Sequence, residues 1–561
     1  MSTTPPEQPD GGTDPVGRGG SVGDRRASLP TAESTLPGSI VQSEGAFDLG
    51  ETPAREVDLA ASPLREMLKI ALPSVITMTS YTVMQFIDAL MVSRITPADP
   101  VYIAAQGNGG IAIWLLVSIA LGLFTVVNTF VSQNLGAGTP RRGTMYGWAT
   151  LWMSGGFALL MIPYALVLPT VFVGFGHDGR LLELETQYAQ IMCIGAAFTA
   201  GGRGIHHYFY GMHRPGIVMV SVIAGNIVNV VANYLLIFGT FGFPELGLMG
   251  AAIGTCLGTA VEFGVPLAVF LGRKYHAEFA TRETWRIDLK PMKDIVRIGW
   301  PGALMFLNEM LCWFYLMAFL CGEAGRRAAE LTVYSGRTAD TIAALDRHLT
   351  IRFVGGTIEP SAALEFAVQQ AATAANTAGW ISLRYMHASF MPAVGLSIAV
   401  TAMVGKAMGM GRPDIASQRA WLGFKIGFVY MGLCALVFVV AGAELIGVFV
   451  PDGTAPEQRA ELIRVGALIM IAAAVFQLFD AGAIIMSAAL RGAGDTVWPG
   501  IVTLMLSWIC IVGGGHLMIE LFPHLGAVGP WIAASAYIVL LGILMIWRFV
   551  AGPWRSIKLV G

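Results

Sequence analysis

Three carboxylates lie deep inside long apolar stretches of this sequence. They are Asp88 in QFIDALMVS, Glu309 in GWPGALMFLNEMLCWFYLMAFL and Asp480 in FQLFDAGA. In a helix that rises ~1.5 Å per residue, Glu309 lies ~12 Å beyond Pro301, close to the middle of a hydrocarbon layer ~30 Å thick. Because a charge at that depth is costly, such acids typically mark ion or substrate sites. A buried carboxylate that hydrogen-bonds a neighbouring helix is the structural alternative.

Amide side chains form a second candidate group. In GNIVNVVANYLLIFG, the spacing of Asn226, Asn229 and Asn233 places them on one face of a helix. Amide oxygens can bind hard cations such as Na⁺, but packing between helices explains an asparagine stripe equally well. The same ambiguity applies to three further acids, for which a structural or interfacial role is at least as good an explanation as function: Glu262, Glu444 and Glu520.

The residues around these groups are those of a membrane protein. Of the 561 residues, 55% are hydrophobic and 13% are charged, whereas soluble domains contain about 25% charged residues. The composition predicts an all-α protein in the lipid bilayer, and the net charge of −2 argues against a nucleic-acid partner. Twelve apolar segments have the length of membrane-spanning helices: 67–93, 103–132, 145–173, 187–211, 215–240, 248–271, 298–321, 375–405, 420–450, 462–489, 497–521 and 526–550.

The two halves of the chain resemble one another. FPELGLMG recurs as FPHLGAVG, and VSQNLGAG at 131–138 recurs as VGKAMGMG at 404–411. Six helices in each half predict two six-helix lobes related by a pseudo-twofold axis along the membrane normal. ALPSV around Pro73 matches GWPGA around Pro301 at an offset of 228, whereas 131–138 matches at 273. About 45 residues are therefore inserted between the seventh and eighth helices.

Composition and charge divide the chain into parts. A Pro-, Gly- and Ser-rich stretch without apolar runs predicts a disordered N-terminal tail, and the mixed charges of the insertion predict a small folded cap. Lys and Arg gather in one set of loops, with Arg141, Arg273, Lys406 and Arg491 among them, which predicts that both termini are cytoplasmic. We expect a cytoplasmic tail at 1–62, an N-terminal lobe at 63–271, a cytoplasmic connector at 272–297, a C-terminal lobe at 298–550 with an extracytoplasmic insertion at about 322–370, and a cytoplasmic tail at 551–561.

Signatures of enzymes and resident metals are missing. The sequence contains neither the phosphate-binding motif GxxxxGK followed by Ser or Thr nor the zinc motif HExxH. Its six cysteines are scattered, without the spacing of a zinc site or a disulfide framework. We therefore expect no enzyme activity, no cofactor and no resident metal, and any pumping has to draw on an ion gradient.

Longer motifs resemble one family of transporters. They are GMHRP followed by NIVNVVANYLLIFG and FPELGLMGAA, then MPAVGLSIAVTAMVGKAMGMG, and SAALRGAGDT. Over about 65–550 the chain is similar to the NorM-like bacterial branch of the multidrug and toxic compound extrusion (MATE) family of cation-coupled antiporters. The resemblance implies that Asp88, Glu309 and Asp480 occupy positions at which the family has acids that bind cation or substrate.

The resemblance also shows one departure and implies a function. Some relatives place an Asn and an Asp four residues apart on the fifth helix, where this chain has Asn229 and Asn233, so the N-terminal lobe keeps one carboxylate rather than two. We expect a monomer in a bacterial inner membrane that exports organic cations or other amphipathic compounds in exchange for Na⁺ or H⁺. The coupling cation, with Na⁺ favoured over H⁺, is expected to bind transiently at Glu309 and Asp480, with the substrate as the small-molecule partner.

A flippase for lipid-linked precursors, from the same superfamily, is the alternative. Such a protein needs a large cavity lined by Arg or Lys to hold a pyrophosphate. The bases expected inside the helices are few, namely Arg203, Arg384 and Lys425, and their small number argues against this alternative without excluding it.

Overall fold

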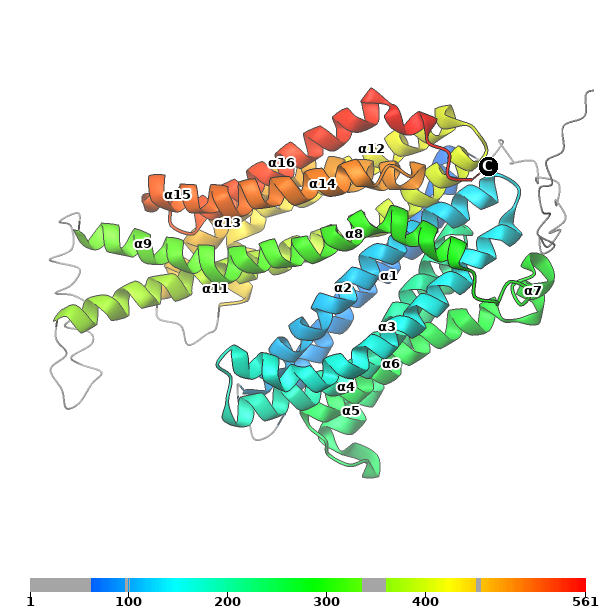
Figure 1. Ribbon diagram of the computed structural model, residues 1–561. Coiled ribbons are helices and arrows are strands. Elements are labelled where there is room, and N and C mark those ends of the chain that lie inside the picture. Colours follow the sequence, from blue (N-terminus) through cyan, green and yellow to red (C-terminus); the bar gives the residue numbers. More distant parts are fainter. Residues whose placement is uncertain (1–61, 96–98, 100, 335–359, 451–455, 561) are drawn as a thin grey trace, which may run out of the picture. The chain divides into compact units, whose positions relative to one another are not determined.

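The computed structural model describes residues 62–95, 99, 101–334, 360–450 and 456–560, and within these ranges it consists of helices and short connections, without strands (Figure 1). Helices satisfy every backbone hydrogen bond internally, which apolar segments in lipid require. The first half contains α1 (Pro63–Val92), α2 (Val101–Gly136), α3 (Pro140–Gly174), α4 (Gly179–Gly211), α5 (Pro215–Phe238) and α6 (Leu248–Phe270).

The second half follows the short helix α7 (Arg273–Phe279). The helix α8 already starts inside the stretch that we expected to be a connector. It continues through a π-helical segment into α9, and α14 continues through another π-helical segment into α15. The second half contains α8 (Leu289–Tyr315), a π-helical segment (Leu316–Leu320), α9 (Cys321–Tyr334), α11 (Pro360–Gly409), α12 (Pro413–Val448), α13 (Pro456–Ala493), α14 (Val497–Leu506), a π-helical segment (Ser507–Gly514), α15 (Gly515–Leu521) and α16 (Val528–Ala551).

The predicted all-α fold of twelve long helical runs, six in each half, is confirmed for the described residues. Eleven of these runs are long and apolar enough to cross a membrane. The exception is α4, which spans 33 residues and packs against α2, α3 and α6. Its low hydropathy has a clear origin, because polar side chains such as Arg203, His206 and His207 lie along it.

The two halves meet through helices that correspond in the internal repeat. α1 packs against α11, and α2 packs against both α8 and α11. At the last turn of α2, a Cβ on Gly136 would meet the carbonyl of Lys406, and a Cβ on Gly409 of α11 would meet the carbonyl of Gln133. These two contacts are related by the 273-residue offset of the repeat, so α2 and α11 pack as a pseudo-twofold axis requires.

Polar contacts join the two lobes at the end of the helices where Gly136 and Gly409 lie. We call it the connector end because α7 and the loops at 137–139 and 410–412 lie there. Glycines alone would bring the backbones together, but these bonds also fix which residues face one another. They are the bond from Thr129 Oγ1 to the carbonyl of Arg491 at 2.9 Å, the bond from Gln133 Nε2 to the carbonyl of Gly492 at 3.1 Å, and the ion pair of Arg419 with Glu66 at 2.9 Å.

The described part of the insertion extends the membrane helices. Figure 1 shows α9 continuing the line of α8, and α9 packs along α11. The charges that suggested a folded cap pair along the helix, as Arg326 and Glu323 do at 2.6 Å. The described residues at 322–334 and 360–370 are thus helical extensions, and 335–359 lie outside the described residues.

The structure describes almost none of the predicted N-terminal tail but nearly all of the predicted C-terminal tail. Of the N-terminal tail, residues 1–61 lie outside the described residues. At the other end, where we expected a tail at 551–561, Trp554 is fully buried. Its ring stacks on Phe549 at a centroid distance of 4.8 Å, and its Nε1 donates to the Phe549 carbonyl at 2.7 Å. The chain after α16 is therefore attached to the C-terminal lobe.

Candidate functional site

Glu309 is positioned by its neighbour on α8. Asn308 is buried; its Nδ2 donates to Ser507 Oγ at 2.7 Å, and its Oδ1 accepts a hydrogen bond from Trp508 Nε1 at 2.8 Å. Both partners belong to the π-helical segment after α14, and such segments are frequent at functional sites. Because successive residues of a helix point about 100° apart, this anchor directs Glu309 to another side of α8. Glu309 is half-buried and has no hydrogen-bond partner among the described residues.

Asp480 faces the same interior from α13. It is 7% exposed, and its charge interacts with that of Glu309. Both acids also interact with the buried Tyr537 of α16, although no hydrogen bond joins the two carboxylates among the residues described. The predicted pair of Glu309 and Asp480 therefore occurs in one lobe. Two carboxylates that repel one another in a weakly polar region favour a cation between them or a proton on one of them.

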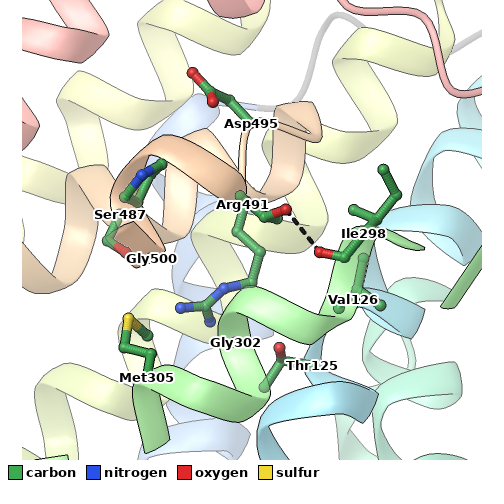
Figure 2. A pocket seen from close by; sticks show the side chains of 12 residues that line it. Thr125, Val126, Ile298, Gly302, Met305, Ser487, Arg491, Asp495 and Gly500 are labelled. Atoms are coloured by element: carbon green, nitrogen blue, oxygen red, sulfur yellow. Dashed lines mark hydrogen bonds between the residues drawn. The ribbon is translucent and has the colours of Figure 1, made fainter. Parts of the chain in front are cut away.

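The position of Arg491 differs from the one that the sequence predicted. The sequence suggested a loop cation, but Arg491 belongs to α13 and lines a small cavity between α2, α8, α13 and α14. Figure 2 shows its side chain extending towards Gly302 and Met305, and the charge of its guanidinium interacts with Glu309. The cavity of 20 Å³ has room for about one water molecule. A fixed positive charge thus lies near enough to Glu309 to interact with it.

The N-terminal lobe holds the predicted acid and amides together. Asn233 Nδ2 donates to Asp88 Oδ1 at 2.8 Å and lies 3.5 Å from Asn229 Oδ1. Asn229 Nδ2 in turn donates to Thr255 Oγ1 on α6 at 3.2 Å. Asn233 Oδ1 is buried without a partner among the described residues and lies against Gly254, where a side chain would collide with it. One carboxylate and two amides therefore form a compact group in which Asn233 Nδ2 faces the oxygens of Asp88 and Asn229.

A second polar cluster in this lobe escaped the sequence analysis. Tyr81 donates to Glu262 Oε1, His206 Nδ1 lies 3.7 Å from the same oxygen, and the Arg203 guanidinium lies 4.3 Å from the centre of the Tyr81 ring. The cluster joins α1, α4 and α6. Its signal in the sequence was the spacing of Arg203, His206, His207 and Tyr210, which puts four polar residues on one face of the fourth helix.

The site residues thus form separate groups. Glu309 and Asp480 lie in the C-terminal lobe, whereas Asp88 lies in the N-terminal lobe with its two amides. Among the described residues no hydrogen bond or ion pair connects Asp88 with Glu309 or Asp480. Each lobe therefore holds buried acids among its own helices.

Comparison with known proteins identifies the family. The MatE family model matches residues 73–235 and 363–514, which is more than half of the chain. The chain belongs to the MatE family. A relative from Mesorhizobium japonicum, described as a probable multidrug resistance protein NorM, is 26% identical over 495 residues, and the match covers 87% of this chain and 93% of the relative.

Solved structures share the fold of this MatE protein. A crystal structure of a MATE protein in complex with MaL6 has a TM-score of 0.73, at 18% identity, with 89% of this chain and 98% of that chain covered. An outward-facing multidrug resistance MATE transporter of the MOP superfamily has a TM-score of 0.69 at the same identity and coverage. MatE proteins are transporters, so this chain is a membrane transporter and not an enzyme.

Proposed function

We propose that this MatE protein is a secondary antiporter that exports organic cations or other amphipathic compounds in exchange for Na⁺ or H⁺. The observation that carries the proposal is the pair of Glu309 and Asp480, whose charges interact in the interior of the C-terminal lobe. In this proposal the protein is a monomer in a bacterial inner membrane with both termini in the cytoplasm. The multidrug resistance relatives support export as the direction of transport.

Competition for the same carboxylates explains the exchange. A ligand shifts a two-state carrier only as far as its affinities for the two states differ. When the coupling ion binds between Glu309 and Asp480, it reduces their negative charge and with it their attraction for a cationic substrate, and when the ion leaves this attraction returns. The lobes therefore release the substrate on the side where the ion enters.

We propose Na⁺ as the favoured ion at the C-terminal acid pair. Na⁺ is a hard cation that prefers oxygen ligands, and two carboxylates can neutralise it without a bound proton. In the N-terminal lobe, the oxygens of Asp88 and Asn229 both face Asn233 Nδ2. This group has one carboxylate and is therefore expected to bind Na⁺ more weakly.

The flippase alternative receives little support from the bases. Of the three that were expected inside the helices, Arg384 and Lys425 are exposed. Arg203 lies beside Glu262, and Arg491 lies beside Glu309. Each of these cations is thus offset by an acid of the same lobe, whereas a pyrophosphate needs a cavity with excess positive charge. The charge balance favours antiport of cations.

Transport in proteoliposomes tests the proposal. With ethidium as the organic cation, an imposed Na⁺ gradient should drive its export by the wild-type protein. Glu309→Gln should reduce this export by at least about tenfold, because the neutral amide removes the charge that both ligands share, a loss of about 1.4 kcal/mol or more. Asp480→Asn should weaken the dependence on Na⁺.

Glu444→Gln is the matched control. Glu444 is an exposed acid on α12 of the same lobe, so its neutralisation should leave export unchanged. If Glu309→Gln exported ethidium normally while Asp88→Asn was inactive, the coupling site would belong to the N-terminal lobe. Absence of export by the wild-type protein under both Na⁺ and H⁺ gradients would refute antiport itself.

A further inference from the structure

The cluster around Glu262 is a buried acid–base pair that the proposed exchange at Glu309 and Asp480 does not use. The His206 side chain is 2% exposed and that of Glu262 is 12% exposed, and their Nδ1 and Oε1 atoms lie 3.7 Å apart. Tyr81 donates to the same Glu262 oxygen. Titratable groups from α1, α4 and α6 thus meet at one carboxylate inside the N-terminal lobe.

Ser221 relates the tautomer of His206 to its hydrogen bonds. Ser221 Oγ has one hydrogen and two acceptors within reach, the Val218 carbonyl at 2.8 Å and His206 Nε2 at 3.2 Å. Donation to the nearer acceptor, the carbonyl, leaves Nε2 as the donor to Ser221 Oγ. In neutral His206, Nδ1 then carries a lone pair, and this lone pair faces the Glu262 oxygen.

Two lone pairs that face one another repel, and a proton on either atom converts the repulsion into attraction. If Nδ1 takes the proton, an imidazolium faces a carboxylate; if Glu262 takes it, a carboxyl O–H faces an acceptor nitrogen. His206 Nδ1 and Glu262 Oε1 are therefore two acceptor atoms that can share one proton. We propose that His206 and Glu262 together bind a transported proton, at a site separate from Asp88 and from the pair of Glu309 and Asp480.

This proposal rests on the antiport proposed above and adds a proton to its cycle. On one side a hydronium ion gives its proton to His206 Nδ1 or to the Glu262 carboxylate and leaves as water. On the other side the proton returns to water, and the pair again consists of neutral His206 and ionised Glu262. No bond other than the one to the proton forms or breaks.

The ligand atoms of the pair favour H⁺ over Na⁺, although the positive charge of Arg203 opposes either cation. Tyr81 faces Glu262 from α1, and α4 contributes Arg203, His207 and Tyr210, whereas α5 contributes the uncharged Ser221 and Asn226. With Glu262 ionised, the charge of Arg203 reduces the attraction for any further cation, so the choice between H⁺ and Na⁺ depends on the atoms that bind it. An imidazole nitrogen is also a poor ligand for a hard cation, but it is a good proton acceptor.

Polar groups connect the cluster with the Asp88 group. Asn226 Nδ2 donates to Ser80 Oγ at 2.6 Å, next to Tyr81, and Asn226 stands one turn from Asn229. In addition, three buried atoms around the cluster have no hydrogen-bond partner among the described residues: Arg203 Nε, His207 Nδ1 and Tyr210 Oη. Buried polar groups of this kind are where a protein interior holds water molecules.

Proton uptake by the purified protein in lipid nanodiscs tests the site without any substrate or gradient. A pH-indicator dye measures the protons taken up between mildly alkaline and mildly acidic buffer. Glu262→Gln and His206→Asn should each take up one proton fewer per molecule than the wild type. His207→Asn is the matched control, because His207 lies on the same helix without contacting Glu262. Any change that it makes in proton uptake should be the same in the wild-type and in the Glu262→Gln background.

Transport of ethidium provides the second measurement. Export driven by an imposed proton gradient should fall at least tenfold in Glu262→Gln and His206→Asn, whereas export driven by Na⁺ should remain. Unchanged proton uptake, or unchanged proton-driven export, in Glu262→Gln would overturn the proposal. If the wild-type protein took up the proton at Glu262 but exported no ethidium under either gradient, the antiport would fail and proton binding would stand.

A variant that removes only one hydrogen bond covers the case in which Glu262→Gln does not fold. Tyr81→Phe deletes the donor to Glu262 and keeps the ring on which Arg203 stacks. The carboxylate then loses a bond that stabilises its charge, so the pair should hold its proton at more alkaline pH than in the wild type. A titration that coincides with that of the wild type would contradict proton binding at Glu262.

Discussion

The contact between α2 and α11 gives a prediction about the conformational cycle. The proposed antiport requires the lobes to separate at the connector end during part of the cycle, and Gly136 and Gly409 lie where they touch. In Gly409→Ala the new Cβ would meet the Gln133 carbonyl. A helical alanine is otherwise favourable by ~1 kcal/mol relative to glycine, and this gain is the same whether the lobes are together or apart.

The clash therefore destabilises only the state in which α2 and α11 touch at the connector end. Overpacking a tight contact costs about 1–3 kcal/mol, so Gly409→Ala should shift the equilibrium away from the state described here by roughly 5- to 150-fold. Gly155→Ala is the control, because Gly155 lies in α3 with nothing within 4 Å of its added Cβ.

Distances between spin labels would measure this shift. The labels are placed at the exposed residues Ala137 and Arg412, just beyond α2 and α11, after replacement of the six native cysteines. The wild-type protein and Gly155→Ala should share a short distance at the connector end, and Gly409→Ala should gain a longer one. An unchanged distance distribution in Gly409→Ala would refute the tight contact and the role that we assign to it.

Three further predictions concern single side chains. Arg491→Gln should lower the Na⁺ concentration for half-maximal ethidium export roughly fivefold, because a cation that competes with Na⁺ for Glu309 is removed, an effect of about 1 kcal/mol; an unchanged or higher requirement would contradict this role. Asn233→Asp should place a second carboxylate beside Asp88 and make export several-fold more dependent on an imposed proton gradient, whereas equal export with and without the gradient would oppose it. Trp554→Ala should lower the free energy of unfolding by about 3–5 kcal/mol, which thermal unfolding in detergent would show, with exposed Trp547→Ala as the control.

Much of the fold followed from local sequence. Apolar length predicted the helices, and recurring motifs predicted two lobes, which the reciprocal contacts of Gly136 and Gly409 support. The resemblance to the family, and not local sequence, implied that Asn229 and Asn233 belong beside Asp88, because the helical face of the amides does not say which helix it meets. In the insertion, however, the balanced charges indicated a folded cap, since side chains that pair along one helix have the same composition as those of a small domain.

What the sequence by itself determined is each side chain's chemistry, its depth in a helix and the helical face on which it lies. Only the tertiary structure decided which faces meet. Arg491 was counted as a loop cation because it lies beyond the apolar segment at 462–489. Packing of α13 against α2, α8 and α14 instead directs its side chain into a cavity, where its charge interacts with that of Glu309. Glu262, His206 and Tyr81 come from three helices, and nothing local relates the rotation of one helix to that of another. Their meeting point depends on how all the helices of the lobe pack together.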